Sequence, residues 1–117
     1  MRFVTLLVIT SSENEDKVKK IAKNAGAGGA TVIQGRGTSS DSEKKSFFSL
    51  TYEGNQVIIV YVLEEKLSRT ILKEFHMYIE NKKIEALAFT LPISHLVGLD
   101  RSLLKKFENS IKTNDDL

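Results

Sequence analysis

The sequence predicts an α+β domain with one antiparallel sheet and helices on one face of that sheet. Three observations predict this class. Apolar runs of strand length recur along the chain, and between them lie segments whose apolar residues follow the three- and four-residue spacing of a helix. The chain has 117 residues, 41% of them hydrophobic, which suits one domain with one core.

The N-terminal third predicts a strand, a helix and a second strand. Residues 2–10 form an apolar run, and Ser11 or Ser12 can cap the helix that follows it. Four apolar residues then share one helix face: Val18, Ile21, Ala22 and Ala25. The second strand is expected over about residues 30–36, where β-formers replace the helical spacing.

A glycine-rich segment, residues 26–38, holds five of the seven glycines. Gly26 predicts the end of the helix, because glycine adopts positive φ without a Cβ clash. The Gly28-Gly29 pair is expected to form a tight turn. Gly35-Arg36-Gly37 lets backbone approach another molecule and places a fixed positive charge there. Arg36 is therefore our first candidate for binding an anion.

The middle of the chain is polar and lacks periodicity over residues 37–46, which predicts an exposed, mobile loop. A strand with one buried face follows from three alternating residues, Phe48, Leu50 and Tyr52. Gly54-Asn55 fits a two-residue hairpin turn. Alternatively, Gly54 bends one long strand, and the residues alone do not decide between the two.

The second half predicts a strand, a helix and a strand. Residues 56–63 read as a central strand, and Glu64-Glu65 open a helix that ends near residues 81–83. The apolar stripe of this helix is Leu67, Ile71, Leu72, Phe75 and Ile79. Residues 86–91 form the last main strand, which Pro92 stops. Asp100 then caps a C-terminal helix over 100–112, and residues 113–117 form a frayed tail.

This order, βαββαβ with an extra C-terminal helix, is the ferredoxin-like plan. The strands are apolar on both faces, since residues 57–62 show almost no alternation. The helices of this plan cover one face only. Self-association covers the other most simply, so we expect a cyclic homo-oligomer.

Composition excludes several function classes. The chain has no cysteine, which rules out disulfides and thiol catalysis and fits a cytoplasmic protein. A net charge of +2 is too weak to indicate nucleic-acid binding. The short N-terminal apolar run fits a strand better than a signal peptide or membrane span. His76 and His95 stand isolated, so we expect no catalytic residues, no metal site and no enzymatic activity.

Three segments together resemble the PII signalling superfamily, in its divergent PII-like branch. They are Gly26-Ala-Gly-Gly-Ala-Thr-Val-Ile-Gln-Gly-Arg-Gly, Tyr61-Val-Leu-Glu-Glu65, and Ala88-Phe-Thr-Leu-Pro-Ile93 with Leu96-Val-Gly-Leu99. Their order and spacing match over about residues 1–100. The first segment is fairly specific, whereas the other two carry weight only in combination.

The resemblance implies a single PII-like domain over residues 1–112 and a compact homotrimer. Residues 37–55 would be the T-loop region, which docks onto a regulated partner such as a membrane transporter, in nitrogen or transport regulation. An adenine nucleotide, ADP or ATP, would bind as an effector and not as a cofactor, in clefts between subunits. The positions that match the family's nucleotide cleft are Gly29, Thr31, Gly37 and Val62. We add Arg36 as a fifth candidate because it carries a fixed positive charge between two glycines.

The sequence also departs from that family. Residues 81–88 lack the glycines of the family's phosphate loop, and Gly98 and Asp100 stand where arginines are expected. A smaller phosphate, a cyclic dinucleotide or another anion therefore stays open, with Arg36, Lys82, Lys83 and Arg101 as its candidate ligands. Two rival functions stay open too: a constitutive interaction module with a vestigial nucleotide cleft, and an amino-acid-binding domain resembling ACT domains.

Overall fold

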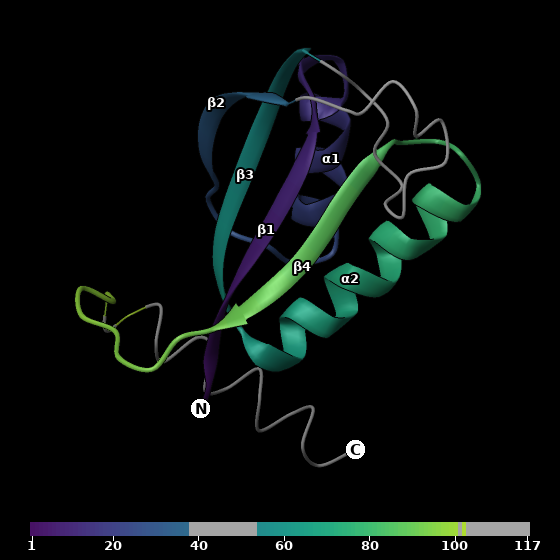
Figure 1. Ribbon diagram of the computed structural model, residues 1–117. Helices are drawn as coiled ribbons and strands as arrows, with labels where there is room; N and C mark the ends of the chain where they lie inside the picture. The colour runs from purple at the N-terminus through teal and green to yellow at the C-terminus, as the bar shows by residue number, and fades with distance from the viewer. Residues whose placement is uncertain (38–53, 101, 103–117) are drawn as a thin grey trace.

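The computed structural model describes residues 1–37, 54–100 and 102. Within these ranges the chain forms an α+β fold in which two helices pack on one face of a sheet (Figure 1). In chain order the elements are β1 (Phe3–Ser11), a 3₁₀ turn (Ser12–Asn14), α1 (Glu15–Asn24), β2 (Thr31–Gly37), β3 (Gly54–Glu64), α2 (Glu65–Glu80) and β4 (Ala86–Pro92).

The sheet has the strand order β2-β3-β1-β4, and every described pair of neighbours is antiparallel. The register places Leu7 of β1 opposite Val60 of β3 on one side and Phe89 of β4 on the other. This arrangement confirms the ferredoxin-like α+β fold predicted from the order of apolar runs.

The core lies between the sheet and the two helices. Strands β1 and β3 supply alternate residues to it, including Leu6, Val8, Ile59 and Tyr61, all with 2% exposure or less. The predicted helix stripes also face the core. Val18, Ile21 and Ala22 of α1, and Ile71 and Phe75 of α2, are buried, while Ala25, Leu67, Leu72 and Ile79 are partly buried against them.

The opposite face of the sheet carries ten of the described apolar side chains, and no described helix covers it (Figure 1). We call this surface the open face: Phe3, Leu7, Ile9, Ile33, Ile58, Val60, Val62, Leu87, Phe89 and Leu91. Ile33, Val62 and Leu91 are 48%, 47% and 47% exposed. The prediction of a sheet that is apolar on both faces is therefore confirmed.

The structure tests three local predictions at the two ends of α1. Gly26 ends α1 as expected, with φ of +115°. The predicted turn at Gly28-Gly29 is wrong, because the chain already turns at Ala25–Gly26 and residues 27–30 form no further turn before β2 begins. The predicted cap at Ser11 or Ser12 is also wrong, since Ser12 lies within the 3₁₀ turn, Ser11 makes no side-chain cap bond, and the residue before α1 is Asn14.

Gly54-Asn55 is not a hairpin turn. Asn55 pairs with Arg36 and Gly54 with Gly37 in the β2–β3 ladder, so both residues belong to β3. The partner strand, and not the dipeptide, decides the conformation here. The predicted loop and strand before Gly54, the C-terminal helix beyond Ser102, and the tail over 113–117 lie outside the described residues.

The Tyr61 hydroxyl is buried and has no hydrogen-bond partner in the described part of the chain. Burial without a partner costs about 1–3 kcal/mol. We therefore expect Tyr61→Phe to raise the free energy of unfolding by about 1 kcal/mol in urea denaturation at pH 7.

Burial also raises the pKa of Tyr61 to about 12, from an ordinary value of 10.0. As the pH rises, the unfolded chain loses this proton before the folded chain does. The parent protein should therefore lose stability between pH 10 and 12, and Tyr61→Phe should lose less. A variant that is less stable at pH 7 would mean that the hydroxyl has a partner.

Candidate functional site

Three of the five predicted site residues lie around the start of β2. Thr31 lies opposite Val60, and Val62 is the next residue of β3 on the same face. Gly29 precedes β2 by two residues, so the same register would bring it level with Val62. A Cβ at Gly29 would meet no atom within 4 Å, which leaves room there for another molecule.

The other two predicted residues lie at the far end of the same strand. Arg36 and Gly37 pair with Asn55 and Gly54, five and six positions beyond Thr31. At about 3.3 Å per residue, Arg36 is about 17 Å from Thr31 along β2. Arg36 is exposed and forms no ion pair with any residue that the structure describes. One chain therefore does not bring the five residues together.

The connection between α2 and β4, residues 81–85, is compact. The amides of Lys82 and Lys83 donate to carbonyl oxygens of α2, at Ile79 (3.0 Å) and Tyr78 (2.8 Å). The Thr10 hydroxyl donates to the carbonyl of Glu85 at 2.7 Å and fixes the end of the connection. These amides are not free to wrap a phosphate, so any anion here would contact the exposed Lys82 and Lys83 side chains.

Lys82 and Lys83 lie at the same end of the sheet as Arg36. Ala86, Thr10, Val57 and Gln34 form one row across the four strands, so the start of β4 is level with the end of β2. However, β2 and β4 are opposite edges. Three steps of about 4.8 Å separate them by about 14 Å.

The segment after β4 holds few chemical groups. Asp100 Oδ1 accepts hydrogen bonds from the amide (2.8 Å) and hydroxyl (2.7 Å) of Ser102, as expected of a helix cap. These bonds lower the pKa of Asp100.

His76 and His95 are both exposed. In the ranges that the structure describes, no three histidine or acidic side chains gather as metal ligands, and no helix is long and apolar enough to cross a membrane.

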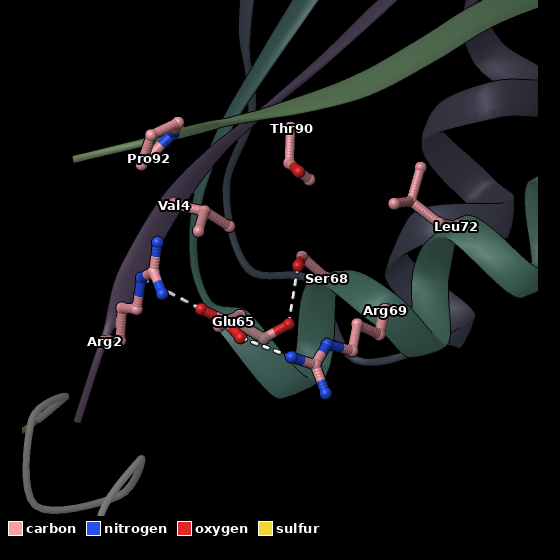
Figure 2. Close-up of a pocket in the computed structure, with 8 residues that line it drawn as sticks. All are labelled: Arg2, Val4, Glu65, Ser68, Arg69, Leu72, Thr90 and Pro92. Carbon is pink, nitrogen blue, oxygen red and sulfur yellow. Dashed lines mark hydrogen bonds and ion pairs between the residues drawn. The ribbon is translucent and has the colours of Figure 1, made fainter.

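A pocket that the sequence did not predict opens between α2 and the end of the sheet where β1 begins and β4 ends (Figure 2). Its volume is about 290 Å³. It is lined by Arg2, Val4, Glu65, Ser68, Arg69, Leu72, Thr90 and Pro92. Val4 pairs with Pro92, next to the Leu6–Thr90 pair, so the pocket lies on the helix-covered side of the sheet. No local motif marks it, since its residues come from three separate segments of the chain, within 2–4, 65–72 and 90–92.

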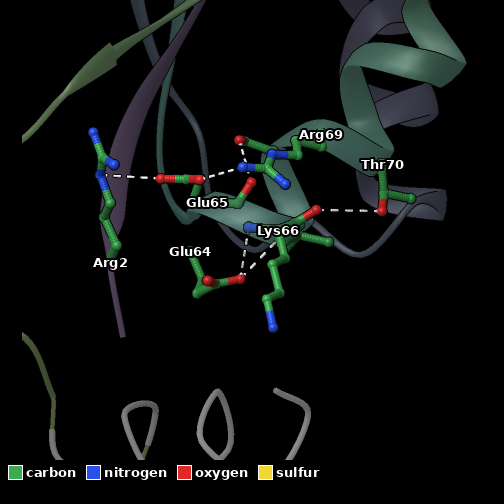
Figure 3. A network of polar contacts seen from close by, with 8 residues as sticks. Arg2, Glu64, Glu65, Lys66, Arg69 and Thr70 are labelled. Carbon is green, nitrogen blue, oxygen red and sulfur yellow. Dashed lines mark hydrogen bonds and ion pairs between the residues drawn. The ribbon is translucent and has the colours of Figure 1, made fainter. Parts of the chain in front are cut away.

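Glu65 is the centre of the polar network at this pocket (Figure 3). One carboxylate oxygen accepts from Arg2 Nε at 3.0 Å, and the other accepts from Arg69 Nη2. The Glu65 amide also donates to the Arg2 carbonyl at 2.8 Å. Glu64 caps α2 separately, accepting from the amides of Lys66 (2.8 Å) and Leu67 (3.4 Å).

No family model and no curated protein matches the chain by sequence. Solved structures match its fold. CPII from Thiomonas intermedia K12, a nitrogen regulatory PII-like protein bound to ADP, AMP and bicarbonate, aligns with a TM-score of 0.63 and 16% identity. The alignment covers 85% of this chain and 98% of CPII.

Two further structures agree with this comparison. A PII-like signalling protein from Thermus thermophilus aligns with a TM-score of 0.59 and 19% identity, over 80% of this chain and 91% of that one. CPII bound to ADP, AMP and acetate aligns with a TM-score of 0.60 and 17% identity, over 78% of this chain and 85% of that one. The fold implied by the sequence resemblance is therefore confirmed.

Proposed function

We propose that this chain, which has the fold of PII-like proteins, is a non-enzymatic regulator that acts as a homotrimer in the cytoplasm. It binds an adenine nucleotide, or another small anionic effector, in clefts between subunits. Binding changes how the 37–55 region docks onto a regulated partner, such as a transporter, in nitrogen or transport regulation. The solved relatives with this fold support the effector class, since CPII is bound to ADP, AMP and bicarbonate.

The observation that carries the proposal is the separation of the site residues on one chain. Gly29, Thr31 and Val62 lie around the start of β2, and Arg36 lies about 17 Å from Thr31 along β2. A single nucleotide can contact both groups if neighbouring copies each contribute one of them. The uncovered apolar face supplies the reason for copies to associate.

The compact α2–β4 connection indicates which phosphates the cleft accepts. Its amides are bonded to α2, so the phosphate is held by side chains: Arg36 of one copy, with Lys82 and Lys83 of its neighbour. Three flexible or exposed cations hold a mono- or diphosphate more easily than a triphosphate, which needs several preorganised donors. We therefore propose AMP or ADP ahead of ATP.

Calorimetry with AMP, ADP, ATP and a cyclic dinucleotide tests the proposal, on protein shown by ultracentrifugation to be trimeric. We expect one nucleotide per chain, with AMP or ADP bound more tightly than ATP. If a folded trimer gives no heat with any of them, the effector part is wrong. That result would favour the second candidate, a constitutive interaction module, which the bonded amides of the α2–β4 connection support. Titration with amino acids separates the ACT-like alternative.

Arg36→Ala should weaken nucleotide binding about tenfold, because a hydrogen bond to a charged group contributes about 1.5–3 kcal/mol. The free energy of unfolding should stay within about 0.5 kcal/mol of the parent, since Arg36 is exposed. Lys73→Ala, an exposed position on α2, is the control for loss of one positive charge. Equal affinities for the two variants would show that Arg36 is not a ligand.

A further inference from the structure

We propose that the pocket between α2 and the paired ends of β1 and β4 is a second binding site. It takes a small organic anion carrying one carboxylate or phosphate group (Figure 2). Arg2 and Arg69 hold the anionic group. Val4 and Thr90 line the pocket from the helix-covered side of the sheet, whereas Thr31 and Val62 lie on the open face. The site is therefore independent of the proposed nucleotide cleft.

The charges of the pocket are unbalanced. Two guanidinium groups face one carboxylate, Glu65, and each bonds a different oxygen of it. A guanidinium has five N–H donors in a planar fork. Arg2 uses Nε for Glu65 and Arg69 uses Nη2, so most of their donors remain available. The arginine side chains are 67% and 68% exposed, and that of Glu65 only 23%, so the cations form the mouth.

The fold does not need both arginines to hold this corner together. The backbone bond from the Glu65 amide to the Arg2 carbonyl already joins β1 to the start of α2. Glu64 already caps α2, so the helix N-terminus is occupied and is not itself the anion site (Figure 3). Glu65 holds two exposed guanidinium groups beside one opening. Recognition of a carboxylate or phosphate requires donors that are preorganised in this way.

The inner wall of the pocket determines the size and polarity of the rest of the ligand. Thr90 lies across the pocket from α2, and its hydroxyl has no hydrogen-bond partner among the described residues (Figure 2). Val4, Leu72 and Pro92 supply apolar surface beside it. The volume of about 290 Å³ is near the lower end for ligand pockets. The ligand is accordingly short, with an anionic end on the arginines and an apolar or hydroxylated body inside.

Titration of the full-length protein with inorganic phosphate, acetate and butyrate, followed by ¹H–¹⁵N NMR, tests the proposal. We expect shifts at the amides of Ser68 and Arg69 and at the side-chain Nε of both arginines, with dissociation constants in the millimolar range. Butyrate should bind up to about tenfold more tightly than acetate, because two more methylenes contact the apolar wall. Phosphate bound best would indicate a phosphate ester, and butyrate bound best a carboxylate.

Arg69→Gln should weaken the best of these probes at least tenfold. Lys73→Gln, which removes a positive charge from the same helix outside the pocket, should change affinity less than twofold. Arg36→Ala should leave these shifts intact, so failure here and failure of the nucleotide cleft are distinguishable. Absence of shifts at this pocket with all three probes, or equal affinity in Arg69→Gln and the parent, overturns the proposal.

Discussion

Ile33→Asp is expected to convert the proposed trimer into a folded monomer. Ile33 lies on the open face opposite Ile58 and is 48% exposed in the single chain, so a monomer tolerates a charge there. In an assembly that covers this face, the carboxylate would be buried without a partner at every interface. Such burial costs several kcal/mol per charge, so association should weaken more than about 1,000-fold. Analytical ultracentrifugation measures the change.

Two further variants make this result specific to the open face. Leu91→Asp, 47% exposed on the opposite edge strand, should have the same effect, whereas Met77→Asp, 55% exposed on α2, should stay trimeric. Nucleotide heat should vanish with the assembly, because the proposed cleft takes residues from two copies. If both open-face variants remain trimeric, the copies associate through another surface. A monomer with full nucleotide affinity would place the cleft within one chain.

The elements were predictable because burial follows local periodicity. The apolar stripe of α2 shows this. Residues three and four apart lie on the same side of a helix, so Ile71 and Phe75 are buried together when α2 packs on the sheet. The two-faced apolar sheet was equally clear from residues 57–62. Gly54-Asn55 was not, because the same dipeptide suits a turn or a strand end. Only its pairing with Arg36 and Gly37, far away in sequence, decides that it is strand.

The candidate site was predictable in composition but not in arrangement. The glycine-rich segment and its resemblance indicated which residues to examine. The predicted strand over residues 30–36 already separated Thr31 from Arg36. It did not indicate that Thr31 lies opposite Val60 and Arg36 opposite Asn55, since that depends on the register of the β2–β3 ladder. The pocket at Glu65 was out of reach for another reason. Arg2 and Thr90 become neighbours of α2 only when β1 and β4 pair.

The glycines of the 26–37 segment fall into two physical classes. Gly26 has a positive φ, and a Cβ there would approach Leu67 Cδ1 to 3.1 Å, so the fold itself requires glycine. Gly29 has neither feature: its surroundings are open, and its φ lies outside the positive region. Nothing in the described part of the single chain explains a glycine at that position. An approaching ligand or second copy would explain it.

Gly26→Ala should therefore destabilise the fold, and Gly29→Ala should impair binding only. For Gly26→Ala we expect a loss of about 2 kcal/mol in urea denaturation, from forcing a Cβ into positive φ. Gly29→Ala should leave that free energy unchanged within about 0.5 kcal/mol. Its nucleotide affinity should fall at least severalfold, because the added methyl occupies space beside Thr31 and Val62. If the nucleotide affinity of Gly29→Ala equals that of the parent, no ligand approaches the chain at Gly29.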